Sequence, residues 1–193
     1  MKYLYILLLF LFSCSQQEIK DVKSDKKNTG INDMEFESFL KLFPQIKLPV
    51  FIEGCKINAE NLHYFSDTTS SAYVETGSYA YGQFKSNGNY KSVITLGIAE
   101  CLLPEIITYS LNGHIIDRKT IAIGYCGDEP CFECLESMTL NQDFTIYTAD
   151  TMITSKCDED FNPILGTETM KIIFKEGKLT EDGIIKLSNI IAK

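Results

Sequence analysis

The sequence contains no tryptophan, only two histidines, His63 and His114, and no basic cluster larger than Lys26-Lys27. An acidic chain with a formal net charge of -8 and no basic patch repels phosphate backbones, so no nucleic acid partner is predicted. The motifs G-x-x-x-x-G-K-[ST], G-x-G-x-x-G, H-E-x-x-H and G-x-S-x-G are also missing. The sequence therefore predicts a protein that is not an enzyme and that has no cofactor and no metal centre.

The sequence also lacks an apolar run long enough to cross a bilayer, which needs about 20 residues. The longest run, residues 3–12, has ten apolar residues between Lys2 and Ser13. After Cys14 the chain turns abruptly polar. A short apolar run with a basic residue before it and a small residue after it is typical of a secretory signal that is removed.

Residues 11–14, Leu-Phe-Ser-Cys, resemble the lipobox of bacterial lipoproteins. The resemblance covers the first fourteen residues and implies a signal peptide over 1–13 that is cleaved before Cys14, which then carries acyl chains. Cys14 would attach the chain to the lipid bilayer, since more than one acyl chain gives stable anchoring. Ser15, in place of aspartate, is similar to lipoproteins that reach the outer membrane. An ordinary signal peptide or a short anchor is the alternative.

Residues 14–33 contain few bulky apolar side chains and carry charges of alternating sign. Such a segment cannot bury a core, so we expect a lipidated cysteine followed by a flexible tether. Residues 34–193 then form a single globular β-rich domain, because their apolar content and length suit one hydrophobic core.

The fold class that the pattern predicts is mainly β, an antiparallel meander in the form of a curved sheet or open barrel, with one short N-terminal amphipathic helix. The helix is predicted from an apolar stripe at helical spacing, preceded by Asn32 and Glu35 as a capping box and ended by Pro44. The residues of the stripe are Phe36, Phe39, Leu40 and Phe43. Residues 184–191 fit either a strand or a helix.

Hairpin turns are predicted at four places along the chain. The predicted turns are residues 86–89, Asn112-Gly113, residues 141–143 and Glu176-Gly177. A two-residue turn at Asn112-Gly113 would set Tyr109 opposite Ile116. Residues that pair across the third turn should have numbers that sum to about 284.

Six cysteines remain besides Cys14, and an even number in an exported chain indicates disulfides. They are Cys55, Cys101, Cys126, Cys131, Cys134 and Cys157. The predicted register gathers all of them except Cys55 at one rim of the sheet, where bridges could close the loop from Cys126 to Cys134 and tie Cys157 or Cys55 to the rest. A zinc site and a redox-active C-x-x-C at Cys131 and Cys134 are the alternatives. Connectivity stays open, because six cysteines allow fifteen pairings.

The sequence defines the function of the protein less closely than its location in the cell. We expect a membrane-anchored exported protein of the cell envelope whose role is structural or binding and whose protein or glycan partner is unknown. Tyr79 and Tyr81 lie on one face of a predicted strand and could bind sugar or peptide. Asp158-Glu159-Asp160 reads as a solvated turn. An enzyme with an acidic site would need two carboxylates that face one pocket about 5–10 Å apart.

Overall fold

The computed structural model describes residues 33–66 and 72–193. The predicted signal peptide, Cys14 and the tether up to residue 32 lie outside the described residues. Residues 31–193 group as one compact unit. The elements of this unit are α1 (Asp33–Leu40), β1 (Val50–Glu53), the 3-10 helix η1 (Gly54–Lys56), β2 (His63–Phe65), β3 (Ser78–Phe84), β4 (Lys91–Ile98), β5 (Leu102–Tyr109), β6 (Ile115–Thr120), β7 (Phe132–Leu140), β8 (Thr145–Thr154), β9 (Thr169–Leu179), β10 (Ile185–Leu187) and β11 (Ile191–Ala192).

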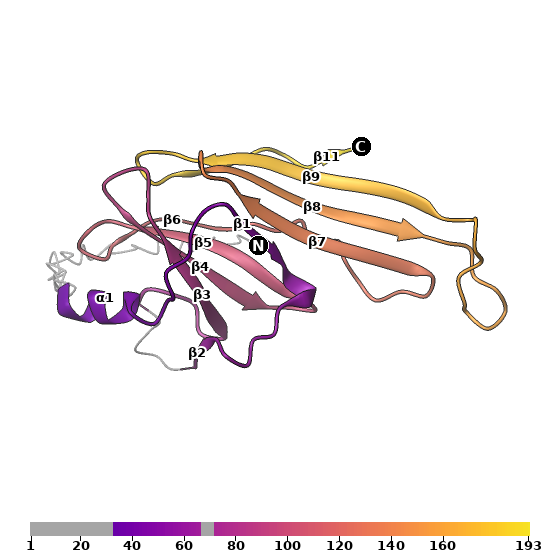
Figure 1. Cartoon of the computed structure of the whole chain (residues 1–193), viewed down its shortest axis with the longest axis horizontal. Coiled ribbons are helices and arrows are strands. Elements are labelled where there is room, and N and C mark those ends of the chain that lie inside the picture. The colour runs from indigo at the N-terminus through magenta and orange to yellow at the C-terminus, as the bar shows by residue number, and fades with distance from the viewer. Residues whose placement is uncertain (1–32, 67–71) are drawn as a thin grey trace, which may run out of the picture. The chain divides into compact units, whose positions relative to one another are not determined.

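The strands form two antiparallel sheets, as Figure 1 shows. Sheet A has the order β2-β3-β4-β5-β6, a meander of consecutive strands. Sheet B has the order β1-β7-β8-β9-β10, and β11 also pairs with β9. The prediction of a mainly β fold with sequential hairpins and one short N-terminal helix is confirmed. The meander is divided between two sheets, and the described strands do not close into a barrel.

The main core lies between the two sheets. Sheet A contributes Ile94, Leu96 and Ile106 to this core, and sheet B contributes Met138 and Leu140, all of them buried. Two apolar faces that pack against each other exclude water from both, which is the main stabilising contribution in such a sandwich. We call this sandwich, together with α1, the body.

A second core covers the other face of sheet A. The apolar stripe that predicts the helix is buried here against Val93, Ile107 and Tyr109, which alternate along β4 and β5 with the residues of the main core. The stripe consists of Phe36, Phe39, Leu40 and Phe43. Helix α1 ends at Leu40. The backbone N–H groups of Leu42 and Phe43 donate turn hydrogen bonds to the carbonyl oxygens of Phe39 and Leu40, and the chain then reaches Pro44. Sheet A is therefore buried on both faces where α1 covers β4 and β5.

Three hairpins close through three-residue loops, in each of which the third residue has a positive φ. The closing pairs are Ser110 and His114, Asn141 and Thr145, and Thr180 and Ile184. The prediction of a two-residue turn at Asn112-Gly113 is therefore wrong in length, and Tyr109 pairs with Ile115 rather than Ile116. Gly113, with φ 84°, suits the left-handed position and allows the extra loop residue.

Two other predictions near the C-terminal end are corrected or decided by the structure. Glu176-Gly177 is not a turn but lies inside β9, and the turn falls at residues 180–183. Gly177 is needed there for close packing, because a Cβ at this position would lie 2.1 Å from the carbonyl oxygen of Lys186 in β10. The ambiguous segment 184–191 contains the strand β10 and the first residue of β11, and no helix.

Candidate functional site

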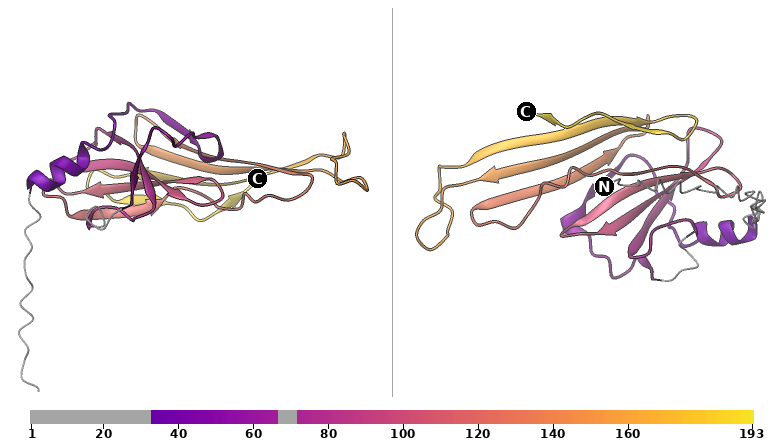
Figure 2. Two further views of the ribbon diagram at one scale, coloured as in Figure 1. Left: turned by 90° about the horizontal axis from the view of Figure 1, so that it is seen from below. Right: turned by 180° about the vertical axis from the view of Figure 1, so that it is seen from behind.

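Sheet B extends beyond sheet A as a three-stranded arm, which is visible in Figures 1 and 2 as long strands β7, β8 and β9 that continue past β4 and β5. The body side of β7 pairs with β1, and this pairing ends at Glu53 and Ser137. Beyond that point β7 pairs only with β8, whereas β9 still pairs with β11 and Lys193 as far as Ile172. We define the arm as residues 132–135, 151–154 and 169–172 together with the connecting loop 155–168.

Two disulfides cross-link the arm. Cys126–Cys134 joins its root to the segment that crosses from sheet A to sheet B, with a Cα–Cα distance of 5.3 Å. Cys131–Cys157 joins the start of β7 to the loop, with a Cα–Cα distance of 5.8 Å. The third bridge, Cys55–Cys101, ties η1 to the start of β5 and lies with Cys126 and Cys134 around one small pocket. All six predicted cysteines are thus disulfide-bonded. The predicted single rim is wrong in part, because Cys55 joins Cys101, Cys126 and Cys134 around the pocket, whereas Cys131–Cys157 lies at the loop of the arm.

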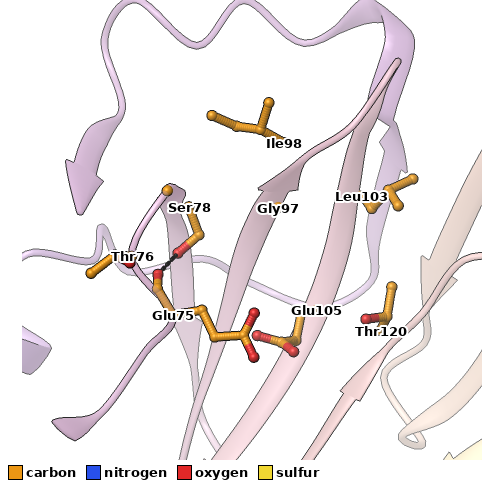
Figure 3. A pocket seen from close by; sticks show the side chains of 9 residues that line it. Glu75, Thr76, Ser78, Gly97, Ile98, Leu103, Glu105 and Thr120 are labelled. Atoms are coloured by element: carbon orange, nitrogen blue, oxygen red, sulfur yellow. Dashed lines mark hydrogen bonds between the residues drawn. The ribbon is translucent and has the colours of Figure 1, made fainter. Parts of the chain in front are cut away.

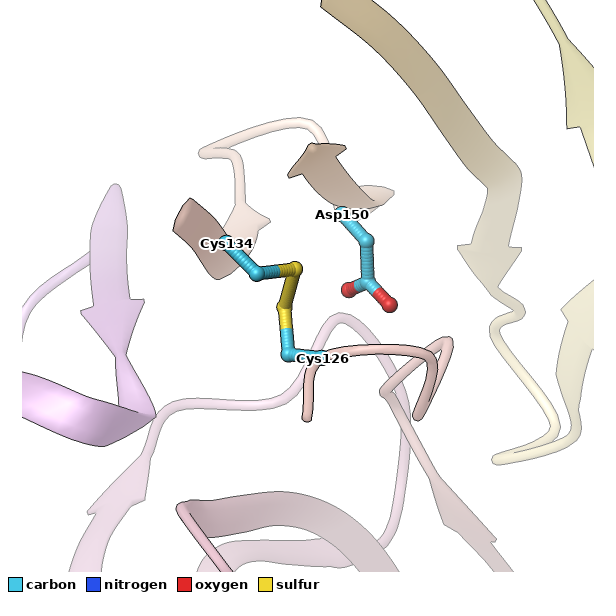
Figure 4. Close-up of side chains that lie close together, drawn as sticks. All are labelled: Cys126, Cys134 and Asp150. Atoms are coloured by element: carbon cyan, nitrogen blue, oxygen red, sulfur yellow. A yellow bond between two sulfur atoms is a disulfide. The ribbon is translucent and has the colours of Figure 1, made fainter. Parts of the chain in front are cut away.

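The disulfides exclude the two alternatives for the cysteines. Cys131 and Cys134 each bond to a different partner, so the C-x-x-C spacing is not a redox pair. Ligand atoms of Cys126, Cys134 and Asp150 lie within 4.8 Å of one another, as Figure 4 shows. The two sulfurs are bonded to each other and carry no thiolate, so this group does not have the donors of a zinc site.

Two buried carboxylates lie beneath the root of the arm. Glu136 of β7 and Asp150 of β8 are cross-strand partners on the same sheet face. Burial, and to a smaller extent the Asp150 carboxylate, raise the pKa of Glu136 to about 7, against hydrogen bonds from the backbone N–H groups of Ile123 and Gly124. Burial also raises the pKa of Asp150, against hydrogen bonding from Tyr125 and Cys126.

These carboxylates fasten the crossover segment 121–126 to sheet B. The Tyr125 backbone N–H donates to Asp150 Oδ2 at 2.8 Å, and Lys175 Nζ donates to the carbonyl oxygen of Ala122 at 3.1 Å. One oxygen of each carboxylate, Glu136 Oε1 and Asp150 Oδ1, is buried without a hydrogen bond. Neither carboxylate lines any of the five pockets described for residues 33–66 and 72–193. Its role is to hold the backbone in place.

The tip of the arm is strongly exposed and apolar. Leu165 is 88% exposed, Phe161 is 70% exposed and Met170 is 67% exposed. Scattered single apolar residues on a surface are ordinary, whereas several large ones exposed at a protruding end are typical of interaction surfaces. The connecting loop 155–168, which with Met170 we call the tip, has one lysine and four acidic residues and therefore a net charge of -3. The tip is therefore both apolar and acidic.

The loop at the tip has a defined conformation. Asp158 accepts hydrogen bonds through Oδ1 from the backbone N–H groups of Asp160 and Asn162, at 2.9 and 2.8 Å, and this bonding lowers the pKa of Asp158. Asp158-Glu159-Asp160 is thus an exposed turn, as the sequence indicates. The loop and the sheet enclose a pocket of about 440 Å³, with Phe132, Ile153 and Leu165 among its walls. This volume lies in the range of ordinary ligand sites.

Tyr79 and Tyr81 lie on β3 and pack against the main core. Both side chains are half-buried, and Tyr79 also contacts Tyr64 at a ring distance of 5.0 Å. The carbohydrate- or peptide-binding face on these tyrosines remains a prediction. Their neighbours Tyr73 and Tyr90 are buried inside the two cores, so the tyrosine enrichment of this region serves packing to a large extent.

Sequence reasoning missed the Glu136–Asp150 pair because of a register error of two residues. The predicted sum of about 284 would set Glu136 opposite Thr148, whereas the observed pairs in β7 and β8 sum to 286. The difference arises at Phe144, which belongs to the hairpin loop with φ 64° rather than to β8. A residue other than glycine at this position left no signal in the sequence from which the one-residue shift of the loop, from 141–143 to 142–144, could have been recognised.

In the part of the chain that the structure describes, no helix has the length and apolar character needed to span a bilayer. A function must be argued from a site rather than from a fold, because one fold hosts many activities. Comparisons of the chain with models of protein families, with curated proteins and with solved structures found no match.

Proposed function

We propose that this chain is an exported, lipid-anchored binding protein of the cell envelope that acts without catalysis and docks a protein partner at the tip of its arm. The observation that carries the proposal is the disulfide-bonded arm with its exposed apolar tip. A surface that costs solubility and is held rigid by two covalent bridges is best explained by contact with another molecule.

The three disulfides indicate an oxidising compartment, because they form and persist outside the reducing cytosol. This supports the export that residues 1–14 predict. Acylation of Cys14 and residence in the outer membrane are the finer parts of the proposal and rest on the lipobox resemblance. A polar tether over residues 14–33 would connect the anchor to α1, which lies at the other end of the unit from the arm tip (Figure 1).

The chemistry of the tip defines the class of partner. Its net charge of -3 opposes binding to anionic lipid or to nucleic acid, whereas Phe161 and Leu165 offer apolar anchors. The complementary surface is a protein with an apolar pocket and a basic rim. The pocket beside Leu165 could in turn accept one apolar side chain of that partner.

A non-enzymatic role agrees with the placement of the titratable groups. Both histidines belong to the surface of sheet A, His63 at its edge strand β2 and His114 at the end of a hairpin loop. The two most buried carboxylates, Glu136 and Asp150, are occupied by backbone N–H groups of the crossover segment. Neither group lines any of the five pockets described for this part of the chain.

Site-specific photo-crosslinking in the producing cells tests the docking surface. A photoreactive residue at position 165 should give one predominant cross-linked protein, whose identity is then determined by mass spectrometry. The same residue at position 111, an exposed leucine in a hairpin loop of sheet A, is the matched control and should not give this product. Equal products at both positions would contradict the proposal.

The chemistry of the contact is tested with the partner that the cross-link identifies. The double variant F161S and L165S should lower its affinity at least about tenfold, and rising salt should weaken the wild-type complex, because the charges attract. The control variant L111S should bind like wild type. Unchanged affinity of the double variant would overturn the docking surface, and an acidic partner would overturn the charge argument.

The anchor is tested separately. The variant C14A should leave the membrane fraction and appear in the soluble fraction of the envelope, since the acyl chains supply the attachment. Metabolic labelling with a fatty acid should mark wild type and not C14A. Retention of C14A in the membrane fraction would contradict the lipid anchor without affecting the docking surface.

A further inference from the structure

A second pocket lies on the outer face of sheet A, away from the arm. It has a volume of about 230 Å³ and is formed by the segment 75–78 and by the ends of β4, β5 and β6. Figure 3 shows the carboxylates of Glu75 and Glu105 at one side of this pocket, with Gly97, Ile98 and Leu103 along β4 and β5. The pocket is independent of the tip and of the proposed function.

The polar side of the pocket contains two carboxylates, and the guanidinium of Arg118, outside the lining, contacts both of them. Arg118 donates from Nη1 to Glu75 Oε1 at 3.3 Å and from Nη2 to the Tyr73 carbonyl oxygen at 2.8 Å. Its Nε lies 3.8 Å from Glu105 Oε2 and makes no hydrogen bond, although it is buried. One cation against two anions leaves the group with one uncompensated negative charge.

Glu105 is the carboxylate that the pocket holds in place. Its side chain is only 16% exposed, whereas that of Glu75 is 75% exposed. Thr95 Oγ1 donates to Glu105 Oε2 at 3.3 Å, and among the described residues no donor is bonded to Glu105 Oε1. Burial raises the pKa of Glu105 and Glu75 adds to the shift, against Arg118 and Thr95. An additional cation beside Oε1 would relieve this cost.

The rest of the pocket wall is apolar and open. Ile98 and Leu103 line it, and Thr120 closes the side formed by β6. Gly97 of β4 precedes Ile98 and pairs with Leu103, and a Cβ added to Gly97 would meet nothing nearer than the Leu103 carbonyl oxygen at 3.8 Å. A glycine in a strand that is not needed for close backbone packing leaves space that a side chain would fill, and here that space belongs to the pocket.

We propose that this pocket binds a protonated amine carried on a short apolar chain, with the ammonium group at Glu105 and the carbons along Ile98 and Leu103. The small volume suits a group of this size and excludes larger ligands. A metal ion such as Ca²⁺ needs about six to eight oxygen ligands, but Arg118 and Thr95 already contact one oxygen of each carboxylate, so few remain for it. The surplus negative charge disfavours an anion. The amine could be a lysine side chain of a peptide or a free alkylamine.

Titration of the 15N-labelled full-length chain in detergent with n-butylammonium tests the site. The amide signals of Gly77, Gly97 and Ile98 should shift and saturate, whereas 1-butanol, which has the same carbon chain and no charge, should shift them at least about tenfold more weakly. Absence of saturable shifts with n-butylammonium at these residues would overturn the proposal.

Two variants locate the bound group in independent ways. E105Q removes the charge while keeping the shape, and it should lower the affinity for n-butylammonium about 10- to 100-fold, as expected for a charge-assisted hydrogen bond. G97V fills the pocket with a side chain that suits a strand and should abolish the saturable shifts. E176Q, an exposed acid on sheet B, is the control and should bind like wild type. Wild-type affinity in either E105Q or a folded G97V would overturn the site.

The source of the amine is decided with three probes. A capped tripeptide with a central lysine should compete with n-butylammonium for the site if the natural ligand is a peptide, and the same tripeptide with acetyl-lysine should not. Binding of n-butylammonium together with no binding of the lysine tripeptide would assign the site to free amines. Folding of each variant is checked by its amide spectrum, and a folded G97V that still binds contradicts the assignment.

Discussion

In the body, Leu140 and Ile146 of sheet B are buried against sheet A, while farther along the same strands Phe132 and Ile153 are only partly covered. The body is stabilised by apolar burial between two sheets. The arm has no second sheet, and its root and loop are joined instead by Cys126–Cys134 and Cys131–Cys157. Covalent bridges take over where the core ends, as is usual where a segment cannot bury enough apolar surface.

The difference has a functional consequence for the arm. Residues that do not pack in the core can present apolar side chains to a partner, because substituting them does not disturb the core. The bridges keep the tip ordered, so that less conformational entropy is lost when the partner binds. Each of the following predictions either separates the body from the arm or tests what holds one of them.

The largest expected effect is in the body. L140A removes a fully buried side chain from the main core and should lower the free energy of unfolding by about 2–5 kcal/mol, the cost of lost burial plus a cavity. Denaturant titration followed by circular dichroism measures it. T139A, the neighbouring residue on the outer face of β7, is the control and should cost less than about 1 kcal/mol. Equal losses would contradict the placement of the core between the sheets.

The next effect concerns the tip bridge. The pair C131S and C157S opens a loop with a sequence separation of 26 and should cost roughly 3.5 kcal/mol in the chain-entropy estimate. The pair C126S and C134S, with a separation of 8, should cost less, roughly 2.5 kcal/mol. Hydrogen exchange should show the loss of protection first in residues 153–170 for the tip pair. Loss spread evenly over sheet A would mean that arm and body unfold as one.

The buried carboxylates at the root of the arm predict a pH dependence. The folded-state pKa of Glu136 is about 7, above the value of 4.5 expected for an unfolded chain. Below about pH 4.5 Glu136 is protonated in both the folded and the unfolded chain, so its burial does not lower the stability. As pH rises towards 7 the unfolded chain ionises first, and the free energy of unfolding should fall by on the order of 1–3 kcal/mol. E136Q should lack this fall. Denaturant titrations of both proteins at pH 4.5, 6 and 8 compare them, and parallel profiles would contradict the raised pKa.

The smallest effect on stability is expected at the tip itself. L165S replaces a side chain that is 88% exposed and should change the free energy of unfolding by less than about 0.5 kcal/mol. Its melting temperature should match wild type while its affinity for the partner falls. A marked loss of stability would show that Leu165 serves packing, and the distinction between body and arm would then fail at this residue.

Local patterns in the sequence predicted a good part of the body. The stripe from Phe36 to Phe43 predicted the helix and its buried face, because helical spacing alone decides which side chains share a face. Asn112-Gly113 marked a real turn, but not its length. Glu176-Gly177 was misread as a turn, since its glycine is required by the approach of β10, a segment that local sequence does not reveal.

The candidate sites depended on more than local pattern. The acid pair of Glu75 and Glu105 comes from segments thirty residues apart that Arg118 of β6 joins, and no spacing in the sequence announces it. Glu136 and Asp150 meet only when the register of β7 and β8 is known to the residue. Both clusters require side chains that are distant in sequence to share one face, which is a property of strand pairing.

Taken by itself, the sequence determined the mainly β class, the short N-terminal helix and the even set of six cysteines available for bridges besides Cys14, because alternation, turn residues and composition act locally or through simple counts. Only the tertiary structure decided that Cys55 pairs with Cys101, that the meander divides into two sheets, and that three strands continue past the core as an arm. These outcomes depend on which remote segments pack together, and that is a balance of burial and chain entropy over the whole domain.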